Sequence, residues 1–441
     1  MKSQLGRPVT LMLAILVIAS LANSFYLPFG ARHVRLEHLA GPAVFVTFAV
    51  SQLLRGKTAV RLDAFSTLAV AWVVANGVSS WLYSPHTSES FVHVIRLGFL
   101  AAIFMTVANL PPLNAEGWRS RIRLWLALVM LELAYGLLVW FLARFWGIWW
   151  PGASLETIMV GISIQGTQLE RNFFGILAAT LLAVAAYILA AQRHRGQPIL
   201  ASTGFLAVAC ALSGGAVVLA LTRSAWLAVV IASPIAYVLF DRRPLTQADR
   251  PLLKAGVGLP VLLGTLIAIL QILPAPGKNQ VAQAPAAAAA VGDRLSTFVR
   301  LNSDFTVNTR LQDARWAVND WLASPLLGRG TGSFKQIHGT RVGTEAWISN
   351  VVLHTLVDTG LVGLVIQMSL FGLVGWRAWQ AACVSREPRL AIGLKAMTLG
   401  LLVMAIAYQL TEGTWLAVFW IHLGLMVNGI YCARAEANAT A

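Results

Sequence analysis

Apolar runs of about 20 residues recur along the whole chain, and this feature most constrains how it can fold. A helical run of that length crosses the hydrocarbon core of a bilayer, which is roughly 30 Å thick. Hydrophobic residues make up 57% of the 441 residues and charged residues only 12%, too few charges to cover a soluble globule with polar surface. The sequence therefore predicts a membrane protein with many spans.

We expect an all-α polytopic membrane protein with about twelve transmembrane helices and one long, partly helical periplasmic loop. Lipid offers no partners to backbone N–H and C=O groups, so each span must satisfy these groups within a helix. The expected spans are residues 9–27, 38–54, 62–83, 91–110, 122–146, 172–191, 199–220, 222–240, 252–274, 350–375, 392–411 and 414–433.

The distribution of Lys and Arg among the loops predicts the orientation. The connections after the second, fourth, sixth, eighth and tenth spans each carry at least two basic residues. The short loops 84–90 and 412–413, on the opposite side, carry none. The positive-inside rule therefore places both termini in the cytoplasm and the long loop outside.

The long outer loop, residues 272–349, separates nine spans in residues 1–271 from three spans and a cytoplasmic tail in residues 350–441. It opens with a Pro/Ala-rich stretch at 274–292 that we expect to be a mobile linker. Apolar residues at spacings of three and four then predict an amphipathic helix over 308–324, on or near the outer membrane surface. The glycines that follow predict a pliable turn.

The formal charge of +15 suggests an anionic partner. The basic residues are spread over short loops and form no soluble domain that could hold a duplex, so nucleic acid is excluded. Topology and an anionic, lipid-borne substrate explain the charge better. Two outer segments, 28–37 and the long loop, are nevertheless basic where the positive-inside rule expects few charges. The three cysteines lie in or beside apolar segments and indicate neither a disulfide framework nor a thiolate metal site.

Three arginines stand out by position. Arg223 lies at the outer end of a hydrophobic span in LALTRSAWLAVV, and Arg96 lies within the fourth span. Each is either a snorkelling residue or a phosphate ligand, because a guanidinium offers paired donors that match phosphate oxygens. Arg310 lies on the expected loop helix, where an ion pair with Asp313 on a solvated face is the ordinary alternative.

His338 is the only histidine in the long loop. Histidine can accept a proton near neutral pH, which a hydroxyl nucleophile requires, although a lone surface histidine is usually inert. His354, just inside a span, is a weaker candidate. The outer acidic residues are scattered without an Asp-x-Asp pair, so the sequence predicts no metal site and no cofactor.

Four stretches of the sequence stand out together: GTQLERN (166–172), LTRSAW (221–226), Arg310 followed by PLLGRGTGSF (325–334), and SNVVLHTLVDTGLVG (349–363). In this order they resemble the O-antigen ligase and polymerase superfamily of bacterial membrane glycosyltransferases. The last stretch departs from the family pattern, because Ser349 stands where the family usually has a catalytic histidine.

The resemblance implies a metal-independent transferase with a GT-C-like helical fold. Such a ligase moves a polysaccharide from undecaprenyl pyrophosphate to the lipid A-core, on the periplasmic face of the bacterial inner membrane and among membrane lipids. Arg223 and Arg310, helped by Arg96 and Arg171, would hold the pyrophosphate. His338, in place of the histidine missing at Ser349, would deprotonate the acceptor hydroxyl for an inverting attack.

Two other functions remain open on the sequence. An O-antigen polymerase would use the same donor with a second lipid-linked glycan as acceptor, and such enzymes often carry two substantial outer loops where this chain has one. A twelve-span secondary transporter would show repeats with broken spans in corresponding positions. We see no such repeat.

Overall fold

The computed structural model describes residues 6–22, 26–29, 32–56, 60–148, 155–158, 161–164, 166–168, 170–240, 305–341 and 344–440. The ninth expected span, 252–274, and the expected linker, 274–292, lie outside these residues. Each of the other expected spans coincides with a helix. Within the described part of the chain, seven helices are long and apolar enough to cross a membrane. The chain is therefore an all-α polytopic membrane protein, and the total of twelve spans stays a prediction.

Helices form almost all of the described structure. The membrane-length helices are α3 (Ala64–Tyr83), α4 (Thr87–Ala108), α5 (Ala115–Trp146), α6 (Arg171–Arg195), α13 (Val351–Val384), α14 (Pro388–Ala407) and α15 (Ala417–Thr440). The other helices are α1 (Gly6–Leu21), α2 (Leu36–Leu53), α7 (Thr203–Leu219), α8 (Arg223–Phe240), α11 (Phe305–Ala323) and α12 (Ser333–His338).

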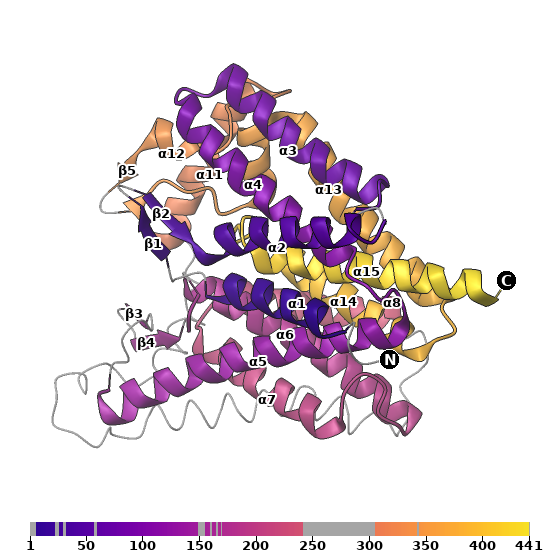
Figure 1. Cartoon of the computed structure of the whole chain (residues 1–441). Helices are drawn as coiled ribbons and strands as arrows, with labels where there is room; N and C mark the ends of the chain where they lie inside the picture. The colour runs from indigo at the N-terminus through magenta and orange to yellow at the C-terminus, as the bar shows by residue number, and fades with distance from the viewer. Residues whose placement is uncertain are drawn as a thin grey trace.

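Three short antiparallel hairpins complete the described fold. They are β1 (Tyr26–Phe29) with β2 (Arg32–Arg35), β3 (Leu155–Ile158) with β4 (Gly161–Ile164), and β5 (Thr340–Arg341) with β6 (Thr344–Glu345). All three lie at the same end of the molecule as α11 and α12, while the start of α1 and the end of α15 lie at the opposite end (Figure 1).

Helix α15 lies at the centre of the bundle. Of its most apolar window, 89% is buried, compared with 39% for α3. It packs against α4, α5, α13 and α14, and its fully buried side chains include Trp420 and Tyr431. Its polar side chains His422 and Asn428 are also buried, and neighbouring helices shield such groups from lipid.

The glycine-rich turn, residues 325–332, is inserted between α3 and the middle of α13. Inside α13, Gly360 has a φ of +63°, so the helix is broken there. The turn uses the backbone groups freed by the break, since Arg329 N–H donates to Val357 O over 2.6 Å. The expected pliable turn is therefore fixed by backbone hydrogen bonds to α13, because buried backbone groups must be paired.

Helix α3 holds the other side of this turn. Gly330 N–H donates to Ser79 Oγ (3.1 Å), and Thr331 N–H donates to Ser80 Oγ (3.0 Å). Gly330 has a φ of +92°, and a Cβ at this position would lie 2.7 Å from Ser84 Cβ. The close backbone approach to α3 thus requires glycine.

Candidate active site

The loop between α14 and α15, residues 408–416, collects side chains from distant parts of the chain. Arg310 Nη1, on α11, donates to Leu410 O over 2.6 Å. Thr411 Oγ1 donates to Ser224 Oγ over 3.4 Å, which places the first turn of α8 beside the same loop. The structure therefore brings two segments that carry predicted arginines to one short loop.

Arg171 and Arg223 are the first residues of α6 and α8. Thr222 Oγ1 donates to Arg171 O over 3.2 Å, so these two helix starts lie side by side. The N-terminus of a helix carries unpaired N–H groups and a partial positive charge, both of which favour an anion. Two such termini, each beginning with an arginine, form an arginine corner next to the α14–α15 loop, where Glu170 also precedes Arg171.

Arg35 joins this site, and the sequence analysis did not include it. It is the last residue of β2, its guanidinium lies 4.5 Å from the ring centroid of Trp415, and its Nη1 lies 3.2 Å from Glu37 Oε1. Burial lowers the pKa of Arg35, while Glu37 opposes the shift and Arg96 adds to it. Arg96, on α4, thus acts electrostatically on Arg35. The only signal in the sequence was that segment 28–37 is basic on the outer side.

His338 lies on α12 and is oriented by a carboxylate. Its Nε2 lies 2.8 Å from Asp320 Oδ2 on α11. Its ring stacks on Trp316, with centroids 4.4 Å apart, and contacts Phe334 at 4.6 Å. A histidine held by an acid in this way has one nitrogen fixed and the other able to accept a proton.

Arg310 and His338 depend on different parts of α11. Arg310 lies near the start of this helix and Asp320 near its end. Ten residues of helix span about 15 Å, so the contact of Arg310 with the α14–α15 loop and the contact of Asp320 with His338 are about this far apart along the axis. The structure thus links both predicted groups through one helix without placing them in contact.

His354 lies at the α14–α15 loop and has a role that sequence reasoning missed. Its Nδ1 lies 3.5 Å from Glu412 Oε2, and its Nε2 lies 3.7 Å from Asp358 Oδ2. Its ring contacts Trp347, with centroids 5.2 Å apart. Two carboxylates suit a ring that donates from both nitrogens, so we assign His354 to fastening the loop onto α13 rather than to accepting a proton. The spacing of four to Asp358 was visible in the sequence, but the contact with Glu412 was not.

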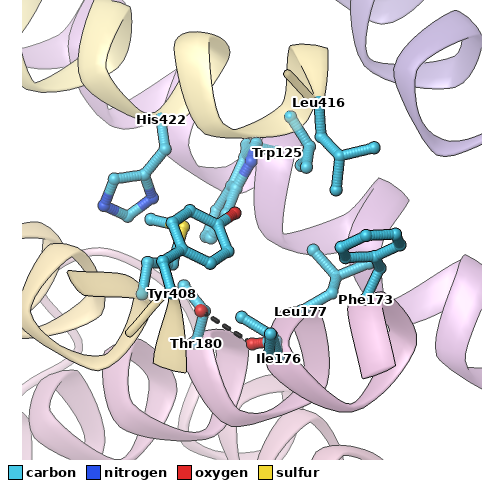
Figure 2. A pocket seen from close by; sticks show the side chains of 10 residues that line it. Trp125, Phe173, Ile176, Leu177, Thr180, Tyr408, Leu416 and His422 are labelled. Atoms are coloured by element: carbon cyan, nitrogen blue, oxygen red, sulfur yellow. Dashed lines mark hydrogen bonds between the residues drawn. The ribbon is translucent and has the colours of Figure 1, made fainter. Parts of the chain in front are cut away.

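A small apolar cavity lies beneath the loop, lined by Tyr408, His422 and residues of α5, α6 and α14 (Figure 2). Its volume is about 10 Å³, the space of about one water molecule. It can hold neither a sugar nor an isoprenoid chain. The loop therefore rests on a closely packed base.

The decisive comparison is with a protein family. Residues 208–368 match the family model described as O-antigen ligase. Over this segment, the chain is similar to the O-antigen ligase/polymerase superfamily. The match confirms the resemblance seen in the sequence. No curated protein matches the chain.

The segment matched by the O-antigen ligase family contains Arg223, Arg310 and His338. It also contains the glycine-rich turn and the first half of α13, which dock on each other. Arg96 and Arg171 lie outside the matched segment, as does the α14–α15 loop. The family domain thus supplies three of the predicted site residues, and the remaining helices supply the surface around them.

Proposed function

We propose that this protein is an O-antigen ligase. It transfers a polysaccharide from undecaprenyl pyrophosphate to the lipid A-core oligosaccharide at the periplasmic face of the inner membrane. The observation that carries the proposal is the meeting of α8, which begins with Arg223, and Arg310 of α11 at the α14–α15 loop, in a chain whose matched domain contains both.

The arginines bind and stabilise the leaving group. When the bond between the anomeric carbon and the pyrophosphate oxygen breaks, negative charge develops on the pyrophosphate. Arg223 and Arg310, with Arg171 beside Arg223 and with Arg96, supply fixed positive charge to it. In comparable sites, each donor that is positioned before the reaction lowers the activation free energy by about 3–4 kcal/mol. This assignment requires no metal ion.

His338 supplies the proton acceptor. Since Nε2 faces Asp320, the proton of the acceptor hydroxyl passes to Nδ1. The acceptor oxygen forms its bond to the anomeric carbon as the pyrophosphate leaves from the opposite face, so the configuration inverts. Asp320 then stabilises the imidazolium, and Trp316 holds the ring in place.

Reconstituted protein tests this function. Liposomes that contain the protein, a glycan on undecaprenyl pyrophosphate and lipid A-core should give glycan-bearing lipid A-core without any ion gradient. Arg223→Ala and Arg310→Ala should each lower the rate at least about 100-fold. Arg377→Ala, an exposed arginine near the other end of α13, is the matched control and should leave the rate unchanged.

The choice of acceptor separates ligase from polymerase. A product formed only with lipid A-core supports the ligase. Elongation of a second lipid-linked glycan would instead identify a polymerase. Full activity of both arginine variants would refute the phosphate site, and dependence on a gradient would favour a transporter.

A further inference from the structure

Glu132 is a buried carboxylate that the proposed mechanism does not use. It lies in the interior of the membrane-length helix α5 and is 6% exposed. An ionisable side chain inside a span is costly and generally has a functional reason. Its partners lie in residues 166–168, immediately before α6, in the stretch GTQLERN.

Both carboxylate oxygens of Glu132 bind Thr167. Thr167 N–H donates to Oε1 over 2.8 Å, and Thr167 Oγ1 donates to Oε2 over 2.7 Å. Gly166 has a φ of +56°, and a Cβ at this position would lie 2.5 Å from Glu132 Oε1. The Gly-Thr pair is thus the sequence that lets the chain pass close to this carboxylate.

The same segment is also tied to α1. Gln168 Nε2 donates to Leu21 O over 2.8 Å, and Thr167 Oγ1 lies 2.9 Å from the same oxygen. Residues 166–168 are therefore held between α5 and the end of α1. Buried hydrogen bonds to a carboxylate are among the stronger contacts that can hold a loop.

This fixed segment leads directly to the arginine corner. Three residues after Gln168, the chain reaches Arg171, whose carbonyl oxygen accepts from Thr222, next to Arg223. We propose that Glu132 is a positioning residue, which fixes residues 166–168 so that Arg171 and Arg223 face one donor pyrophosphate. This inference rests on the proposed function of the arginines.

Binding of undecaprenyl pyrophosphate to the purified full-length protein tests the role of Glu132. Glu132→Ala and Thr167→Val should each raise the Kd at least about tenfold, because each removes the contact between Thr167 Oγ1 and the Glu132 carboxylate. The double variant should bind no more weakly than Glu132→Ala, because Glu132→Ala already removes both contacts with Thr167. Glu132→Gln should stay within about threefold of wild type, since its amide oxygen can still accept from Thr167 N–H and its NH2 group can donate to Thr167 Oγ1. Thr180→Val is the matched control, because Thr180 Oγ1 bonds only within α6 in the described contacts; it should leave the Kd unchanged.

Several outcomes would overturn the inference. Wild-type affinity in Glu132→Ala or Thr167→Val would do so, as would equal weakening by Thr180→Val or by Glu132→Gln. If Glu132→Ala does not fold, Thr167→Val decides, because it leaves the carboxylate in place. Absence of binding by the wild-type protein would instead refute the proposed function, and the role of Glu132 with it.

Discussion

At the scale of single residues, His338 is the assignment that most needs a test, because Ser349 occupies the place where the family usually has its histidine. His338→Gln keeps a donor that can reach Asp320 and fills a similar volume between Trp316 and Phe334. It cannot act as a base near neutral pH. We therefore expect kcat to fall by about 100-fold or more while the midpoint of thermal unfolding stays close to that of wild type.

The control for this prediction is His86→Ala, at the exposed start of α4, which should transfer glycan at the wild-type rate. Transfer by His338→Gln at the wild-type rate would show that the ring only packs the small core around α11 and α12. The base would then have to be sought elsewhere in the site.

At the scale of elements, the break in α13 and the glycine-rich turn form one unit. At the break, Leu361 N–H donates to Pro325 O (2.9 Å) instead of to the preceding helical turn, and Val362 N–H donates to Leu326 O (3.1 Å). Gly360 faces the turn so closely that a Cβ would collide with the backbone of Leu326.

Gly360→Ala should therefore destabilise the protein by roughly 2–4 kcal/mol, from the positive φ and the collision together. The midpoint of thermal unfolding in detergent measures this effect. Gly372→Ala, in the same helix, is the matched control, since a Cβ there meets nothing within 4 Å. The control should be neutral or stabilising by up to about 1 kcal/mol. Equal midpoints for the two variants would contradict this account of the break.

The sequence predicts well the helices that are determined by the residues of one continuous segment. The span expected at 172–191 corresponds to Arg171–Arg195, and the helix expected at 308–324 corresponds to Phe305–Ala323. A period of 3.6 residues or a long apolar run determines both locally. The break at Gly360 could not be predicted in this way, because the partners that satisfy its backbone lie 28 to 36 residues earlier in the chain.

At the scale of the whole molecule, the sequence again predicts the local features of the site but not the contacts between distant segments. The sequence marks Arg223 and His338 as unusual, since a charge at the end of a span and a lone outer histidine are visible locally. Arg310 is marked only by the family resemblance. The sequence does not reveal the α14–α15 loop as the meeting place of the segments that carry the two arginines. In the sequence, residues 412–413 contributed only the absence of basic residues. The contacts of Leu410 with Arg310 and of Trp415 with Arg35 join positions 100 and 380 residues apart, and only the packed bundle brings them together.

The arrangement of the bundle also sharpens the orientation predicted from charge. The hairpins, α11 and α12 lie at one end, and the start of α1 and the end of α15 lie at the other (Figure 1). If the positive-inside rule holds, the first end is periplasmic and the second cytoplasmic. The chain carries its own reporter of the second side, because Cys383, near the end of α13, is exposed while Cys210 and Cys432 are buried.

We therefore expect a membrane-impermeant thiol reagent to leave the wild-type protein unlabelled in intact cells and to label Cys383 once the membrane is opened. Asn319→Cys, at an exposed position of α11, should be labelled in intact cells. Combining it with Cys383→Ser assigns that signal to position 319. Labelling of Cys383 in intact cells would invert the topology and place the arginines in the cytoplasm. The proposed reaction would then have to use lipid-linked glycan on the cytoplasmic face, which a periplasmic ligase does not do.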